Sequence, residues 1–169
     1  SINNGASFNA SSYTINLGGN WGNSGTFVPV TSTVTLNGTS KTINGTTTFN
    51  KMTVYGSYSV INNSDITYSG LLFVTATGTY AAGGGTATVS GDLTNSGSLT
   101  STGITTFTGT SLQTIRLINA LVSTSTGVVN FNGNVAPVLN STSAPTFANL
   151  NINNTAGVNP SKDWLVMVS

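Results

Sequence analysis

The chain has 169 residues, which is enough for one domain with a hydrophobic core. Only 4% of its residues are charged, against about 25% in ordinary globular domains, and the net charge is +1. With 37% hydrophobic residues the chain can collapse, so its low charge is not a sign of disorder. Four scattered cations cannot neutralise many phosphates, and no apolar run approaches ~20 residues. We therefore expect no nucleic-acid partner and no membrane insertion.

The residue types that most often carry catalysis are scarce. Histidine and cysteine are absent, which removes the commonest general base and the usual transition-metal ligands. A paired-carboxylate glycosidase needs two carboxylates within ~5–10 Å, but Asp65, Asp92 and Asp163 are far apart in sequence. Residues 62–65 (Asn-Asn-Ser-Asp) group the oxygen ligands that calcium prefers, yet a polar turn is the favoured interpretation. We predict no enzyme, no cofactor and no metal site.

Short alternating segments predict an all-β chain. Thr, Val, Ile, Tyr and Phe dominate, and Gly and Asn interrupt every few residues. Alternation places apolar side chains on one face of a strand and polar ones on the other. In chain order, the predicted strands lie at residues 13–17, 33–36, 49–55, 58–61, 66–68, 72–77, 87–89, 104–107, 128–131, 147–152 and 165–168.

An internal repeat organises the chain. The stretch Gly-Asn-Trp-Gly-Asn-Ser-Gly-Thr-Phe at residues 19–27 is matched by Gly-Asp-Leu-Thr-Asn-Ser-Gly-Ser-Leu at residues 91–99, an offset of about 72 residues. The copies extend over residues 13–43 and 85–115, with a partial copy at residues 128–152. No shift in composition divides the chain, so we expect a single domain over residues 1–169.

Two β architectures compete. Asn-Gly dipeptides, as at residues 37–38 and 44–45, are hairpin signals that favour an antiparallel β-sandwich or jelly roll. A long repeat of short strands favours a β-solenoid, in which we expect equivalent positions to fill the same internal place. Because of the repeat, we predict a parallel β-helix, or β-solenoid, of about seven to nine coils.

The repeat also resembles a known class of proteins. Residues 19–27, the following Val-Thr-Leu-Asn-Gly-Thr-Ser-Lys-Thr-Ile at 34–43 and Thr-Phe-Asn-Lys-Met-Thr-Val at 48–54 look like repeats of bacterial Asn/Thr/Gly-rich parallel β-helix surface proteins, adhesin-like or autotransporter-passenger-like. The resemblance covers roughly residues 13–155. It implies a right-handed β-helix that is exported, with a role at the cell surface or in extracellular matrix. Since the chain begins at Ser1 and is shorter than such proteins, we expect processing, such as removal of a signal peptide, or a segment of a longer protein.

The two chain ends suggest how such a solenoid would be used. No amphipathic capping helix is visible at either end, and an uncapped end exposes strand edges that invite another strand. The most hydrophobic predicted strand is the last one. We therefore expect an extracellular structural protein that builds or decorates a surface fibre or adhesive matrix, with copies of itself or neighbouring repeats as partners. The candidate assembly strand is Trp164, Leu165, Val166, Met167 and Val168.

Two other functions stay open. Tyr55, Tyr58 and Tyr68 could stack on sugars, which would make the chain a polysaccharide-binding module. Ranked threonines on a flat solenoid face could match an ice surface, although Thr is also the default outward residue of a charge-poor strand. The Thr-x-Thr pairs begin at Thr33, Thr46, Thr75, Thr77, Thr86, Thr106 and Thr124.

Overall fold

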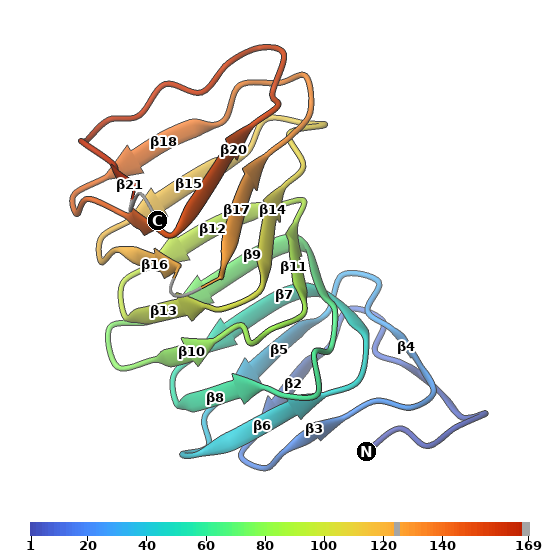
Figure 1. Ribbon diagram of the computed structural model, residues 1–169. Helices are drawn as coiled ribbons and strands as arrows, with labels where there is room; N and C mark the ends of the chain where they lie inside the picture. Colours follow the sequence, from blue (N-terminus) through green and yellow to red (C-terminus); the bar gives the residue numbers. More distant parts are fainter. Residues whose placement is uncertain (124–125, 167–169) are drawn as a thin grey trace.

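A computed structural model describes residues 1–123 and 126–166 as a β-solenoid of about 8 turns (Figure 1). Every strand pair within these residues is parallel, and no helix occurs in them. The predicted all-β parallel solenoid is therefore confirmed, and the antiparallel sandwich or jelly roll is wrong. The turns stack in chain order, from blue at the N-terminal end to red at the C-terminal end.

Successive strands lie on three sides of the solenoid, which we name faces A, B and C. Face A consists of β1 (Ser7–Asn9), β4 (Thr26–Val28), the first parts of β7 (Thr47–Val54) and β9 (Ile66–Val74), β11 (Thr86–Val89), β14 (Ile104–Phe107), β17 (Val128–Phe131) and β20 (Asn149–Ile152). Face B consists of β2 (Thr14–Leu17), β5 (Thr33–Leu36), the second parts of β7 and β9, β12 (Asp92–Asn95), β15 (Thr114–Leu117) and β18 (Val138–Ser141). Face C consists of β3 (Trp21–Gly22), β6 (Lys41–Asn44), β8 (Ser57–Val60), β10 (Thr79–Ala81), β13 (Ser98–Ser101), β16 (Leu121–Ser123), β19 (Thr146–Phe147) and β21 (Leu165–Val166).

The long strands β7 and β9 join two of these faces. Each runs around the corner between face A and face B, so one 11-stranded sheet covers most of both. The pairing of β7 with β9 shifts register between Phe49 and Lys51, at that corner. Gly70 of β9 lies so close to the carbonyl of Asn50 that a Cβ atom would collide with it. A larger residue at this corner would therefore force the two turns apart.

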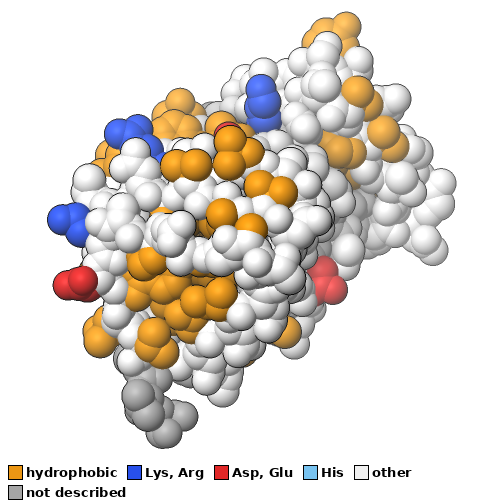
Figure 2. Space-filling model, turned by 90° about the horizontal axis from the view of Figure 1, so that it is seen from above, with side chains coloured by type: hydrophobic (Ala, Val, Ile, Leu, Met, Phe, Trp, Pro, Cys, Tyr) orange, Lys and Arg blue, Asp and Glu red, His pale blue; other side chains and the backbone are white. Residues whose placement is uncertain are grey.

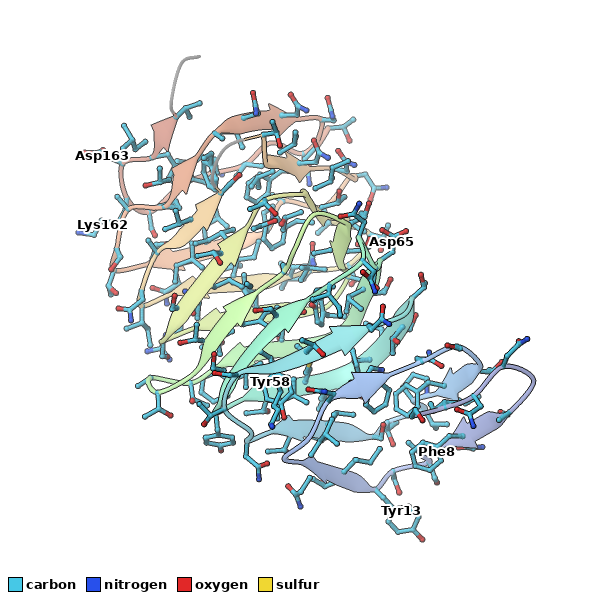
Figure 3. The ribbon with its side chains drawn as sticks, turned by 60° about the horizontal axis from the view of Figure 1, so that its bottom comes forward. Phe8, Tyr13, Tyr58, Asp65, Lys162 and Asp163 are labelled. Atoms are coloured by element: carbon cyan, nitrogen blue, oxygen red, sulfur yellow. The ribbon has the colours of Figure 1, made fainter. Side chains whose placement is uncertain are left out.

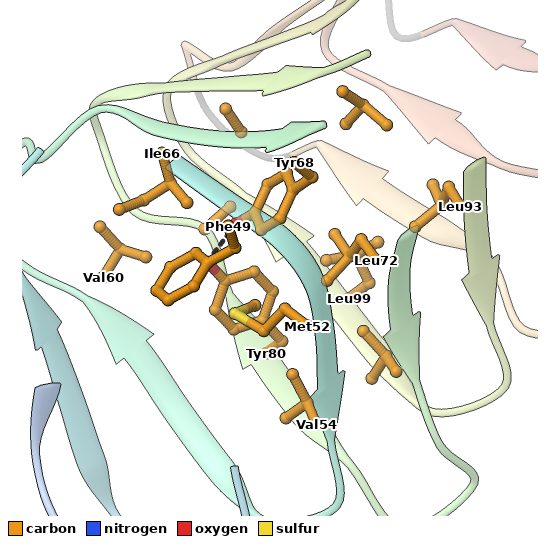
Figure 4. Close-up of a cluster of buried hydrophobic side chains, with 14 of the residues drawn as sticks. Phe49, Met52, Val54, Val60, Ile66, Tyr68, Leu72, Tyr80, Leu93 and Leu99 are labelled. Carbon is orange, nitrogen blue, oxygen red and sulfur yellow. Dashed lines mark hydrogen bonds between the residues drawn. The ribbon is translucent and has the colours of Figure 1, made fainter. Parts of the chain in front are cut away.

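Inward-pointing side chains form continuous columns along the solenoid (Figure 4). Within the middle turns they are fully buried, and each buried Leu, Ile or Phe contributes about 1.5–3 kcal/mol by leaving water. The column on face B is Ile15, Val34, Met52, Leu72, Leu93, Ile115 and Leu139. The column on face A includes Phe49, Tyr68, Val89, Phe107, Phe131 and Ile152.

The Asn-Gly dipeptides turn the chain from one face to the next and make no hairpins. Gly45 lies between β6 on face C and β7 on face A, with a φ of 94°. Gly133 follows β17 on face A and precedes β18 on face B, with a φ of 102°. Positive φ is easy for glycine because it has no Cβ atom. The hairpin signal thus marks a corner, since turn chemistry does not by itself decide strand direction.

The two main copies of the repeat lie on different faces, so the expectation that equivalent positions fill the same place is wrong. Trp21 of β3 is on face C, whereas its counterpart Leu93 of β12 is on face B, although both side chains point inward and are buried. What the copies share is a buried corner asparagine. Asn23 Oδ1 accepts a hydrogen bond from the Gly25 amide (3.2 Å), and its Nδ2 donates to the Thr46 carbonyl (3.0 Å).

Asn95 makes the same arrangement at a different corner. Its Oδ1 accepts from the Gly97 amide (3.2 Å), and its Nδ2 donates to the carbonyls of Asn119 and Ala120 (both 3.0 Å). A corner leaves backbone carbonyls without a partner in a strand ladder, and a buried amide satisfies them. The repeat therefore encodes a corner with its flanking strands, and that unit can be used on any face.

Candidate functional site

The first turn of the solenoid leaves the apolar interior open at the N-terminal end (Figure 3). Phe8 of β1 is 43% exposed although it extends the inward column of face A by one turn beyond Phe27, toward the N-terminal end. Among the described strands, β1 pairs only with β4, and β2 only with β5, so their outer edges are free. A hollow of about 170 Å³ opens here, lined by Ser1, Ile2, Phe8, Leu17, Asn20, Trp21 and Gly22.

The last turn is partly covered by Trp164. Its ring stacks on Phe131, with centroids 5.4 Å apart and an interplanar angle of 19°, and it meets Phe147 edge-on at 5.3 Å. The cover is incomplete, because Ile152 and Val166 are still 51% and 42% exposed. Figure 2 views the molecule from above, toward this end, and shows hydrophobic side chains gathered on it.

The residues predicted as an assembly strand divide into three groups. Leu165 and Val166 form β21, which pairs with β19 in the register Thr146↔Leu165 and Phe147↔Val166. Trp164 precedes this strand and packs on the chain's own core. Met167 and Val168 lie outside the described residues. The outer edge of β21 has no partner among the described strands, so the assembly role stays a prediction.

A ladder of hydroxyl and amide side chains runs along the outside of face A. Three hydrogen bonds connect its upper part, each donated by the later turn to the earlier one. Asn130 Nδ2 donates to Thr106 Oγ1 (3.3 Å), and Asn151 Nδ2 donates to Asn130 Oδ1 (2.9 Å). Beside them, Asn153 Nδ2 donates to Asn132 Oδ1 (3.3 Å). The rank in strand register is Thr48, Thr67, Thr88, Thr106, Asn130 and Asn151.

The predicted Thr-x-Thr pairs are not collected on one face. Thr33 and Thr35 lie on face B, whereas Thr86, Thr88 and Thr106 lie on face A, and Thr108 follows the end of β14. Thr75 is buried, and its Oγ1 donates to the Val54 carbonyl (3.0 Å). Thr124 lies outside the described residues. Thr48, from the pair that begins at Thr46, belongs to the same rank on face A as Thr88. Thr67 lies between them in this rank and was missed, because rank neighbours are set by strand register between turns.

Two of the three tyrosines predicted to contact sugars are inside the core. Tyr58 and Tyr68 are 1% and 0% exposed, so the prediction is wrong for both, because neither ring can stack on a glycan. Tyr55 is 51% exposed, and its sugar contact stays a prediction. The alternation Ile66-Thr67-Tyr68 could have placed Tyr68 inside, since its neighbour two residues earlier is apolar.

The buried tyrosines use their hydroxyls to satisfy groups inside the solenoid. Tyr58 Oη donates to the Leu17 carbonyl (2.8 Å) and accepts from the Gly38 amide (3.2 Å). Tyr68 and Tyr80 are hydrogen-bonded to each other through their hydroxyls. Burial raises the pKa of all three, and the neighbouring Tyr80 raises that of Tyr68 further. These groups therefore stay neutral and structural at neutral pH.

The aspartates are used locally. Asp65 Oδ1 accepts from the Thr86 amide (2.7 Å), and Asp92 Oδ1 accepts from the Thr114 amide (2.8 Å), so each joins one turn to the next. Asn62 and Asn63 have φ values of 56° and 49° and form a tight turn before Asp65. Within residues 1–123 and 126–166, no three His, Cys, Asp or Glu side chains come together.

The fold places the chain among the parallel β-solenoids, and the comparisons go no further. No protein-family model, no curated protein sequence and no solved structure matches this chain. The likeness to bacterial surface proteins is thus carried by the quoted repeats alone. In the part of the chain that the structure describes, no helix has the length and hydropathy needed to cross a lipid bilayer.

Proposed function

We propose that this chain is a structural β-solenoid module of an extracellular fibre or adhesive surface layer, joined to further modules end to end. The observation that carries the proposal is that both ends of the rod expose its apolar interior together with unpaired strand edges. An exposed edge of a parallel sheet offers the same backbone groups that pair inside the sheet, so an added turn gains hydrogen bonds and buries apolar surface at once. The described residues contain no capping helix to prevent this addition.

The shapes of the two ends support a head-to-tail contact. The N-terminal end is a hollow, whereas Ile152 and Val166 are exposed at the C-terminal end. A hollow on one end and apolar side chains on the other make a heterologous contact, which repeats without closing and generates a filament.

The charge distribution also supports association. No charged side chain precedes Lys41, so the N-terminal end carries none. Near the C-terminal end the charged residues are the neighbours Lys162 and Asp163, whose signs are opposite. Long-range repulsion between two such ends is therefore weak, and near-zero net charge favours association.

The test uses sedimentation velocity and negative-stain electron microscopy on the purified chain over a concentration series. The chain is expected to form rods in series, and Val166→Lys is expected to leave single rods because it puts a charge into the apolar contact. The matched control is Leu112→Lys, which changes a 67% exposed leucine outside the named strands and should assemble normally. Circular dichroism checks that both variants fold. A wild-type chain that stays monomeric at high concentration contradicts the proposal.

Ice binding is a second candidate, favoured by one observation. Thr48, Thr67, Thr88 and Thr106 form an unbroken outward rank on neighbouring turns of face A. Crystal shaping in a freezing droplet tests it, and Thr88→Tyr should abolish the shaping by interrupting the rank. Polysaccharide binding now depends on Tyr55 alone among the three predicted tyrosines. A glycan array with wild type and Tyr55→Ala tests that alternative, and the structural proposal expects no saturable sugar binding.

A further inference from the structure

The side-chain ladder on face A has a direction. At the three hydrogen bonds in its upper part, the donor belongs to the later turn and the acceptor to the earlier one. Stacked asparagine side chains of this kind add to the backbone pairing of parallel strands. The last members, Asn151 and Asn153, donate hydrogen bonds from Nδ2 to the preceding turn. Their Oδ1 atoms accept no hydrogen bond from any described residue, so the ladder ends with two acceptors at the C-terminal end of the rod.

The first strand of the chain offers the matching donors. Ser7 and Asn9 are the outward residues of β1, on the same face A, and both are exposed. Asn9 Oδ1 already accepts from the Ser11 amide (2.9 Å). Its Nδ2 makes no hydrogen bond to the described residues, so it is a donor available at the N-terminal end of the rod. Between these two residues, Phe8 points inward and continues the aromatic column of face A.

This inference rests on the end-to-end assembly proposed above. We infer that the module joined to each end is a second copy of this chain, stacked in one defined register. In this register β1 of the incoming copy stacks on β20, with Ser7 over Asn151, Phe8 over Ile152 and Asn9 over Asn153. Phe8 then covers the exposed Ile152 in the core column. Asn9 Nδ2 donates to Asn153 Oδ1 and Ser7 Oγ donates to Asn151 Oδ1, so both ranks continue across the join in their existing direction.

Other registers lose these matches. A shift by one residue turns Phe8 outward, because side chains alternate along a strand. A shift by two residues keeps Phe8 inside but moves it off the exposed Ile152, to the half-buried Leu150 in one direction and to the polar Asn154 in the other. On face C, this stacking brings β21 to the level of Ile2 in the incoming copy. Ile2 is paired only through an isolated bridge to Asn23, so β21 displaces it.

Engineered disulfides test the register, and the chain suits them because it has no cysteine. The matched pair is Ser7→Cys with Asn151→Cys. Directly opposed residues on neighbouring strands are ~4.8 Å apart, within the range for a disulfide, whereas a two-residue offset gives roughly 8 Å. The slipped pairs are Ser7→Cys with Asn149→Cys and Ser7→Cys with Asn153→Cys. Asn130→Cys with Asn151→Cys, which are in register inside one chain, is the internal positive control.

Mild oxidation of each full-length double variant is followed on a non-reducing gel. The expected result is a ladder of linked chains for the matched pair, several-fold stronger than for either slipped pair. A stronger ladder from a slipped pair, or filaments by microscopy without any matched cross-link, overturns the register while the proposed fibre function stands. Absence of both filaments and cross-links overturns the proposed function as well. Deleting residues 1–4 is expected to keep or strengthen the matched ladder, and a several-fold loss contradicts the displacement of Ile2.

Discussion

The two ends of this solenoid are built around tryptophans that serve different purposes. Near the N-terminal end, Trp21 is buried beneath the first turn, between Phe27 and Phe49, with ring centroids at 4.9 and 5.1 Å. At the C-terminal end, Trp164 lies on top of the last complete turns and is only partly buried. One ring fills the core from inside, and the other covers part of the core from outside.

This difference gives the rod a direction. A hollow remains where the N-terminal turn does not fill its interior, whereas apolar side chains are exposed beside Trp164. In the proposed head-to-tail contact, the exposed apolar side chains of one end would face the hollow of the other and leave water there. The difference between the ends comes from the placement of a few aromatic residues in otherwise similar turns.

The largest expected effect is on stability, and it differs between alanine variants of the two tryptophans. Trp21→Ala removes a buried ring and the hydrogen bond from its Nε1 to Thr47 Oγ1 (3.2 Å), so it should lower the free energy of unfolding by about 3–5 kcal/mol. Trp164→Ala removes a partly buried ring and should cost roughly 1–3 kcal/mol. Urea denaturation of freshly diluted, monomeric protein measures both. Equal losses would mean that the two ends are closed to the same degree.

A smaller effect is expected at the N-terminal end from Tyr58→Phe. The change leaves the ring in place but removes the hydroxyl that holds the Leu17 carbonyl and the Gly38 amide. Leaving these buried groups unpaired should cost roughly 1–3 kcal/mol. Tyr55→Phe, at an exposed ring, is the matched control and should change the urea midpoint little. Hydrogen exchange adds a local readout, with faster exchange at Gly38 expected in Tyr58→Phe alone.

Alkaline pH should lower the free energy of unfolding through two buried tyrosines in the middle of the rod. The hydrogen-bonded pair Tyr68 and Tyr80 has pKa values raised above the ordinary 10.0, chiefly by burial. The folded chain therefore keeps these hydroxyls neutral where the unfolded chain ionises them. The stability is intact below pH about 10 and falls as the pH rises above it. Urea midpoints measured from neutral to alkaline pH test this.

The double variant Tyr68→Phe with Tyr80→Phe should lose less stability between neutral and alkaline pH than the wild type. The surface variant Tyr13→Phe is the control and should lose as much as the wild type. An unchanged alkaline loss in the double variant would place the responsible groups elsewhere. No effect on the urea midpoint is expected from these pKa shifts at neutral pH, so the comparison of the two ends is unaffected there.

Much of the fold was predictable because solenoid strands follow simple alternation. Thr33–Leu36, Ile104–Phe107 and Val128–Phe131 were predicted with their observed bounds. Strands such as Asp92–Asn95 and Ser98–Ser101 were missed. They contain a single strongly apolar residue each, and their remaining inward positions are filled by Asn95 and Ser101. A polar residue can face the core when a corner carbonyl or another hydroxyl satisfies it, and a hydrophobic pattern does not show this.

The candidate site was less predictable for a related reason. Exposure at an end depends on which strand has no neighbour, so Phe8 is exposed whereas Phe49, in the same column, is buried. Tyr58 and Tyr68 were misassigned because a tyrosine hydroxyl can be satisfied inside a solenoid, at a carbonyl or at another tyrosine. The ladder of face A was missed because its members are about one turn apart in sequence, and turn lengths vary.

The smallest expected effect concerns that ladder, and it compares a middle turn with the end. Asn130 both donates to Thr106 and accepts from Asn151, so Asn130→Ala removes two partly exposed hydrogen bonds and should cost roughly 0.5–1 kcal/mol. Asn151→Ala removes one bond at the open end and should cost less in the monomer. In the assembled state the order should reverse, since Asn151 then accepts from Ser7 of the next copy. Concentration-dependent sedimentation of the two variants checks this, because Asn151→Ala should weaken association more than Asn130→Ala does. The same ranking in monomer and polymer would show that the ladder stops at the end of each chain.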